Sequence, residues 1–144
     1  MEPGTGLITH KAENMAARID IYPEKALVVL TYSGEIDDKE LIQPFTSLSA
    51  HPDFDPSFSE IVDFSQARDA NVSTEAIRKM AQSTSLYHTA ARHAVVAPQH
   101  HVYGLVRMYQ TLAEATRPNL IVVRSVDEAY ARLGIVPPGK EEQY

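Results

Sequence analysis

Apolar positions along the chain follow two spacings, and each spacing predicts a different kind of element. Residues 17–22 carry apolar side chains at every second position, which is typical of a strand with one exposed face. After a turn at Pro23, the β-branched stretch 26–33 predicts a second strand, and the short connection makes the pair an antiparallel hairpin. Residues 60–64, 93–97 and 120–123 are short apolar runs of the kind found in buried parallel strands.

Four further segments repeat apolar residues at helical spacing. The first begins at Asp37, the second at Ser73 or Thr74, the third follows Pro98, and the fourth ends at Gly134, which suits a C-terminal cap. The resulting order is β-β-α-β-α-β-α-β-α. Because strands separated by helices form right-handed parallel crossovers, the sequence predicts an α/β fold. Its sheet is mostly parallel, has an antiparallel edge hairpin, and is packed against helices.

The length of 144 residues fits one domain, and we predict a single domain over residues 1–144. The ordered core is expected at about residues 17–135. Residues 1–15 contain Gly and Pro without a sustained period and predict a flexible N-terminal arm, and residues 139–144 predict a short charged tail.

Composition removes several classes of function. The net charge is −6 and the basic residues are scattered singly, which argues against nucleic-acid binding. With no cysteine, the chain has no disulfide, no thiolate nucleophile and no Cys-based metal site. The apolar runs are far shorter than the ~20 residues of a membrane helix. The first residues lack the pattern of a signal peptide, so we expect a cytoplasmic protein.

Six segments carry a resemblance that covers nearly all of the predicted core. They are residues 30–36 (LTYSGEI), 51–54 (HPDF), 61–65 (IVDFS), 94–98 (AVVAP), 103–108 (YGLVRM) and 125–129 (SVDEA). Together they resemble the SpoIIAA-like family of the STAS superfamily, from about Arg18 to Leu133. The segment 103–108 with its preceding strand is the most specific part.

The resemblance implies the STAS-type fold and a binding or regulatory role. Members of the superfamily include anti-sigma-factor antagonists, which bind a kinase-like partner and are switched by phosphorylation at an Asp-Ser-Ser-Gly-like segment. Others look like binders of lipids or other apolar molecules, as CRAL-TRIO-like proteins are. Ser73 and Thr74 match the switch hydroxyls, but the preceding Asp and the following Gly are missing. They are therefore candidate phosphorylation sites, and capping of the helix is the alternative.

Polar residues near the carboxyl ends of the predicted strands form the candidate ligand site, because ligands gather at this edge in parallel sheets. The candidates are Asp63, Ser65, His100 and His101. For Asp63, the alternative is capping of a turn through Ser65 or Gln66. The spacing of the histidines does not bring a metal-ligand set together, so no metal site is predicted.

Tyr103 and Arg107 are four residues apart and share one side of the third helix. Either the Arg covers the ring, or the Arg contacts an anion or headgroup as part of the ligand site. Gly104 between them is unfavourable in a helix by about 1 kcal/mol. Close packing against the sheet, or a nearby ligand, would account for it.

Motifs of nucleophilic, phosphate-loop or dinucleotide-binding enzymes do not occur in the sequence. The first hypothesis is a non-catalytic module that binds a protein partner or an apolar, lipid-like small ligand without a cofactor. The alternative is a small enzyme that uses Asp63 with His100 or His101, and a dispersed triad with Ser65 stays open. The edge hairpin of residues 17–33 also offers a surface for a homodimer.

Overall fold

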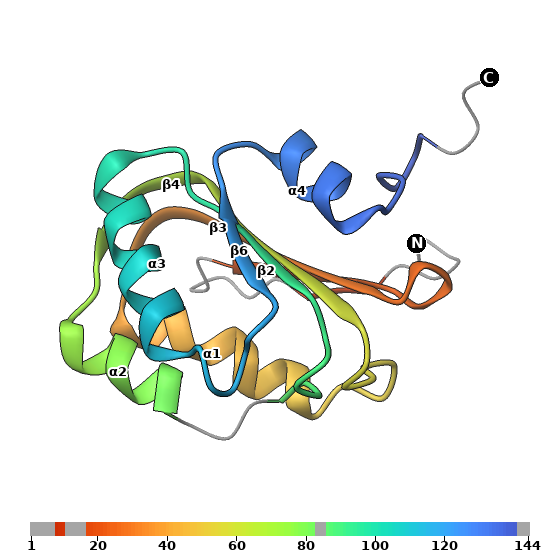
Figure 1. Ribbon diagram of the computed structural model, residues 1–144, viewed down its shortest axis with the longest axis horizontal. Coiled ribbons are helices and arrows are strands. Elements are labelled where there is room, and N and C mark those ends of the chain that lie inside the picture. The colour runs from red at the N-terminus through yellow and green to blue at the C-terminus, as the bar shows by residue number, and fades with distance from the viewer. Residues whose placement is uncertain (1–7, 11–16, 83–85, 141–144) are drawn as a thin grey trace.

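Six strands form one sheet, and their order across the sheet is their order along the chain. The computed structural model describes residues 8–10, 17–82 and 86–140 (Figure 1). The strands β1, β2 and β3 pair antiparallel, whereas β3, β4, β5 and β6 pair parallel. Their bounds are Ile8–His10 (β1), Ala17–Tyr22 (β2), Leu27–Asp37 (β3), Ser59–Asn71 (β4), His93–Val96 (β5) and Leu120–Val123 (β6).

Helices cover both faces of the sheet. Figure 1 shows α1 (Asp38–Ser49), α2 (Thr74–Gln82) and α3 (His100–Leu112) on one face and α4 (Val126–Leu133) on the other. The buried side chains accordingly form two clusters, one beneath α1 to α3 and a smaller one beneath α4. A short 3-10 turn (η1, Pro23–Lys25) joins β2 to β3. The α/β fold with a mostly parallel sheet is confirmed.

Local signals in the sequence explain where the helices begin and end. Asp37 accepts from the amide of Glu40 at 2.8 Å, and Glu40 accepts in return from the amide of Asp37 at 3.1 Å. This capping box satisfies two amides that a helix start leaves open. At α4, the hydroxyl of Ser125 caps the start, and Gly134 ends the helix in the left-handed region with φ +70°.

The first strand lies where the sequence predicted a loose arm. Residues 8–10 pair with Ile19–Ile21 of β2, so the prediction of an unstructured arm is wrong there. The rest of the predicted arm and residues 141–144 of the tail lie outside the described residues. Because β1 occupies the outer side of β2, the hairpin of residues 17–33 is not at the edge of the sheet. Strand pairing between two copies is therefore blocked at residues 19–21 of β2, and a homodimer that packs through the hairpin stays a prediction.

The strand β4 is more than twice as long as the predicted residues 60–64. It continues to Asn71 alongside the extended β3, and the register shifts between Thr31 and Ser33 and again between Gly34 and Glu35. Gly34 has φ +74°, which favours glycine at this irregular position. Asp63 therefore lies within a strand. The sequence had predicted it at the end of one, and that prediction is wrong.

Two smaller corrections concern single residues. The alternation in residues 17–22 predicted that Asp20, which lies between Ile19 and Ile21, is on the exposed face, but Asp20 is buried, and Arg18 Nε donates to its carboxylate at 2.9 Å. Gly104 was expected to accommodate close packing. A Cβ built there would meet no atom within 4 Å, so neither packing nor a described neighbour requires glycine at this position.

Candidate functional site

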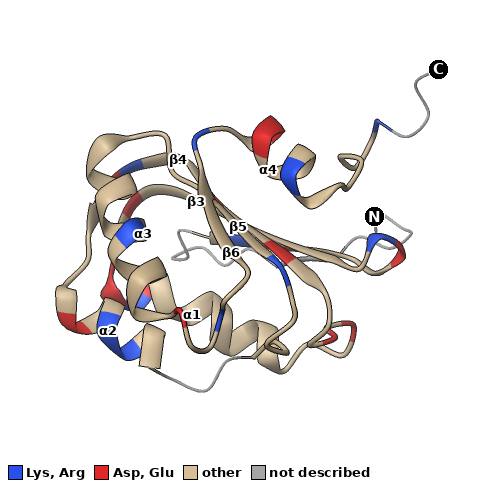
Figure 2. Ribbon diagram, viewed as in Figure 1, with Lys and Arg blue, Asp and Glu red and all other residues tan. Residues whose placement is uncertain are grey.

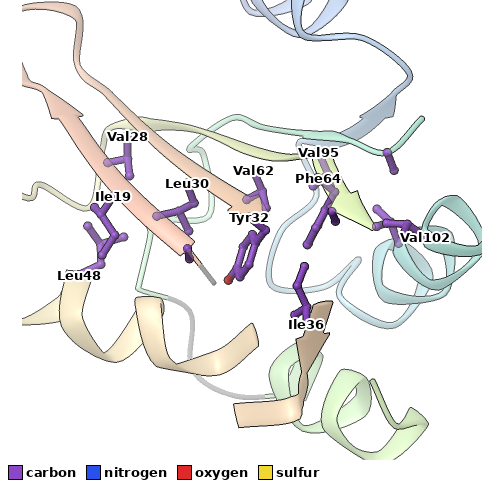
Figure 3. Close-up of a cluster of buried hydrophobic side chains, with 14 of the residues drawn as sticks. Ile19, Val28, Leu30, Tyr32, Ile36, Leu48, Val62, Phe64, Val95 and Val102 are labelled. Atoms are coloured by element: carbon purple, nitrogen blue, oxygen red, sulfur yellow. The ribbon is translucent and has the colours of Figure 1, made fainter. Parts of the chain in front are cut away.

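A cavity of about 80 Å³ lies between the sheet and the three helices α1, α2 and α3. Most of its wall is aliphatic or aromatic, and it includes side chains that Figure 3 shows extending from the strands toward the helices. The labelled side chains that line it are Tyr32, Ile36, Val62, Phe64, Val95 and Val102. Seventeen residues line this small volume, which we call the slot.

Tyr32 fixes one wall of the cavity. Its ring stacks on Phe64 with 4.8 Å between centroids and 18° between planes. Its hydroxyl donates to the carbonyl of Leu41 in the first turn of α1 at 2.6 Å. This bond satisfies a buried polar tip and ties α1 to the sheet, so the wall is held in one position.

One carboxylate reaches this apolar space. Glu60, the second residue of β4, lines the cavity and is 4% exposed. His93, the first residue of β5, pairs with it in the sheet register, and His93 Nδ1 donates to Glu60 Oε1 at 2.8 Å. His93 is 1% exposed and packs edge-on against Tyr87 at 4.8 Å between ring centroids. The pair is a buried polar contact in an otherwise apolar core.

Tyrosines surround the carboxylate. Burial and then the negative charge of Glu60 raise the pKa of Tyr32 and of Tyr87 well above the usual value. Burial also raises the pKa of Tyr109, which lines the cavity from α3, and Glu60 adds to this while Arg117 opposes it. All three phenols are therefore protonated at neutral pH and can act as hydrogen-bond donors.

A surface hollow of about 250 Å³ adjoins the cavity. Phe45 of α1 and Met80 of α2 line both, so these two side chains separate the cavity from the hollow. Methionine is unbranched and adapts its shape easily.

The structure places the predicted ligand residues away from this cavity. Asp63 points to the α4 face, where Tyr130 lies. The pKa of Tyr130 is raised mainly by burial, and the charges of Tyr22 and Asp63 add smaller effects. The Asp63 carboxylate accepts from the amide of Ser65 at 2.8 Å, so the local capping interpretation describes this contact. Ser65 itself is exposed.

The two histidines at the start of α3 behave differently. His101 Nε2 donates to the carbonyl of Ala70 at 3.1 Å, and its neighbour Gln99 donates to Ala67 at 2.8 Å. Both bonds fasten the start of α3 to the far end of β4. His100 is exposed. Within the described part of the chain, no hydrogen bond joins Asp63 to either histidine.

Tyr103 and Arg107 form an exposed contact on α3. Arg107 Nη1 donates to the Tyr103 hydroxyl at 3.4 Å, and this bond lowers the pKa of Tyr103, with smaller effects from Arg124. Arg124, in the loop between β6 and α4, covers the ring at 3.9 Å from its centroid. The sequence predicted that Arg107 covers the ring, and this is wrong, because Arg124 lies over the ring and Arg107 contacts only the hydroxyl. Basic and acidic residues are interspersed over the described helices and loops (Figure 2).

Ser73 caps the start of α2. This is the capping role that the sequence predicted as the alternative to a phosphorylation site. The Ser73 hydroxyl accepts from the amide of Ala76 at 3.1 Å and donates to Asp38 at 2.7 Å. The amide of Ser73 also donates to Asp38 at 2.7 Å, and both bonds lower the pKa of that carboxyl. A phosphate on Ser73 would meet the Asp38 charge directly. Thr74 is the first residue of α2 and is exposed.

Sequence reasoning missed Glu60 and His93, although a signal was present. Each is a polar residue at the start of a buried-type strand, and β4 and β5 are consecutive parallel strands. Such residues lie side by side in a parallel sheet. The sequence prediction had instead placed the site at the opposite, carboxyl ends of the strands.

The described residues contain no group of three or more His, Asp or Glu side chains that could hold a metal ion. None of the described helices has the length and apolar character needed to span a membrane.

Comparison with known proteins gives one weak structural likeness to report. No family model matches the sequence, and no curated protein matches it. The chain is similar to the crystal structure of an uncharacterised protein of the DUF3478 family from Shewanella loihica PV-4, which is described as having a SpoIIAA-like fold. The two are 11% identical with a TM-score of 0.46, over 92% of this chain and 98% of the other. This likeness concerns the path of the backbone and says nothing of a ligand or an activity.

Proposed function

We propose that the protein is a non-catalytic module that binds a slim, apolar small molecule in the cavity beneath α1, α2 and α3. The observation that carries this proposal is the cavity itself, which is apolar and bounded by one sheet face and three helices. Ligand sites in proteins are typically concave, mostly apolar and largely pre-formed.

Energetics support a ligand in this space. An empty cavity of 80 Å³ lowers stability by about 2 kcal/mol relative to a filled one. The volume is roughly half that of a 150 Å³ cavity that admits benzene, which favours a linear or flat ligand over a bulky one. A molecule that fills the slot restores the missing contacts and stabilises the folded state.

Other functions have less support from the described surface. Among the described residues, the exposed large apolar side chains are Ile42 of α1, Leu112 of α3 and Val136 after α4; single exposed apolar residues are ordinary on a protein surface. Of the residues proposed for an enzyme, Asp63 and His101 each bond to a backbone group. A small ligand therefore accounts for more of the structure than a protein partner or a catalytic site.

Two variants of one residue test the proposal. Val95 lines the cavity, so Val95→Phe should fill it and Val95→Ala should widen it. The purified protein is examined by native mass spectrometry for bound small molecules, and its Tm is measured with linear alcohols of increasing chain length. We expect the wild type to be stabilised with an optimum at a short chain, Val95→Ala to shift that optimum to longer chains, and Val95→Phe to lose the response. If no probe raises the Tm of the wild type or of Val95→Ala, and no molecule co-purifies, the proposal is wrong.

A further inference from the structure

Arg117 connects the surface hollow with the wall of the slot. It is the one charged side chain among the described residues that line the hollow. Its guanidinium carbon lies 5.5 Å from the centre of the Tyr109 ring, and Tyr109 lines the slot. The hollow and the slot also share Phe45 and Met80 in their walls. A positive charge is therefore present where the apolar space approaches the surface.

The charge of Arg117 has no carboxylate partner within the described part of the chain. None of the ion pairs there includes Arg117. Its Nη1 donates to the Thr116 hydroxyl at 3.2 Å, and this is the one hydrogen bond that its guanidinium makes to a described residue. A guanidinium has five N–H donors in a planar fork, which matches the two oxygens of a carboxylate. The half-buried Arg117 can therefore accept an anion from outside.

The two charges near the slot favour one orientation of a charged ligand. Glu60 is enclosed in the core, where it is bonded to His93 and Tyr87. Burial raises the pKa of Tyr109 most, the charge of Arg117 lowers it, and the charge of Glu60 raises it. Both charges therefore act on the wall of the slot. An anionic group is attracted to Arg117 and repelled by Glu60, so it belongs in the hollow with its apolar chain directed inward.

We infer that the ligand is a linear carboxylate, whose apolar chain fills the slot while its carboxylate binds Arg117 in the hollow. This inference rests on the function proposed above and adds the charged group that the site selects. The chain passes between Phe45 and Met80, and the unbranched side chain of Met80 adjusts to it. Because the slot has roughly half the volume of a cavity that admits benzene, a chain of about six carbons is a suitable probe.

The test compares hexanoate, hexylamine and 1-hexanol, which share one chain and differ in the charge of the head group. Their affinities for the wild-type protein are measured at pH 7 by NMR titration of the ¹⁵N-labelled protein. We expect hexanoate to bind about tenfold or more tightly than hexylamine, since a hydrogen bond to a charged group is worth at least that much. The net charge of −6 attracts the amine, so the overall charge cannot produce this preference. 1-Hexanol should displace hexanoate, because both chains need the slot.

Two variants locate the recognising group. Arg117→Gln removes the positive charge, so we expect the preference for hexanoate over hexylamine to fall to within about threefold. Arg107→Gln is the matched control, because Arg107 is exposed on α3 and lines neither the slot nor the hollow. It removes the same charge and should leave the preference unchanged. 1-Hexanol should bind the wild type and both variants alike.

The outcomes separate this inference from the proposed function. If 1-hexanol binds but hexanoate binds no more tightly than hexylamine, the slot takes ligands without selecting a carboxylate, and only the inference is overturned. A preference that survives in Arg117→Gln or disappears in Arg107→Gln also overturns it, as does simultaneous binding of hexanoate and 1-hexanol. If none of the three probes binds, the proposed function itself fails. Should Arg117→Gln not fold, the comparison of the probes on the wild type still decides.

Discussion

Val95 and Val96 are neighbours on β5 that face opposite sides of the sheet, and they offer a matched test of where the structure has spare room. Val95 lines the cavity beneath α3, whereas Val96 is fully buried in the cluster beneath α4. The same substitution, Val→Leu, adds one methylene group at either position. Any difference between the two variants therefore reports the space around each side chain.

The magnitudes follow from the packing on each side. At Val95, the added group enters an 80 Å³ cavity and contributes up to about 0.8 kcal/mol of stability through burial. At Val96, the added group has to displace close-packed neighbours, which costs about 1–3 kcal/mol. We therefore expect Val95→Leu to be about 2–4 kcal/mol more stable than Val96→Leu.

Equilibrium unfolding in urea measures this difference. Because the chain has no tryptophan, far-ultraviolet circular dichroism is the appropriate signal. The slope of free energy against urea should be the same in both variants, so that a shift in midpoint reports stability. Equal destabilisation of the two variants, or a more stable Val96→Leu, would show that the cavity is not open to a side chain and would refute the reasoning.

Three further predictions concern the scaffold. Gly104→Ala should stabilise the protein by about 1 kcal/mol, because alanine favours the helix and its Cβ meets no neighbour. Gly134→Ala should destabilise it by about 1–2 kcal/mol, because residue 134 has a φ of +70°. Urea midpoints that move in the same direction for both variants would contradict this pair of predictions. The lowered pKa of Asp38, due to its bonds with Ser73, gives a stabilisation that is complete above the ordinary value of 3.8 and is lost as the pH falls through the lower folded value. The Tm of Asp38→Asn should therefore approach that of the wild type as the pH is lowered from 6 to 2, and a constant gap would exclude the mechanism. Arg92 donates to two carbonyls at the end of α4, at 3.0 and 2.7 Å. Arg92→Ala should therefore lower the free energy of unfolding in urea by about 1–3 kcal/mol. A decrease below about 0.5 kcal/mol, the size of ordinary surface changes, would show that these bonds do not stabilise the fold.

The sequence predicted the elements whose packing is regular. β5 and β6 are short apolar runs, and α1 begins at a capping box, so periodicity and local chemistry agree there. The extension of β4 was missed because its register shifts break the alternation. Its buried residues Ala67 and Ala70 are three positions apart, and charged residues stand between them. Alternation at a period of two cannot detect a strand of this kind.

The candidate site was harder to predict for a different reason. A cavity is the space that side chains leave, and it depends on how helices distant in sequence rest on the sheet. Val62, Val95 and Val102 look like ordinary core residues in the sequence, and only their relative placement leaves the slot. Glu60 and His93 could have been paired from strand order, because both lie near the start of neighbouring parallel strands.

The identity between strand order and chain order has a consequence for how the protein reaches its native state. Every strand pairs with the strand before or after it in the chain, so each pairing closes a comparatively short loop. Among mostly parallel sheets, such sequential pairing keeps the contact order lower than pairings between strands far apart in the chain, and a lower contact order favours faster folding. During synthesis, the sheet can also grow from β1 toward β6 as each strand emerges, with each new strand pairing to one already in place.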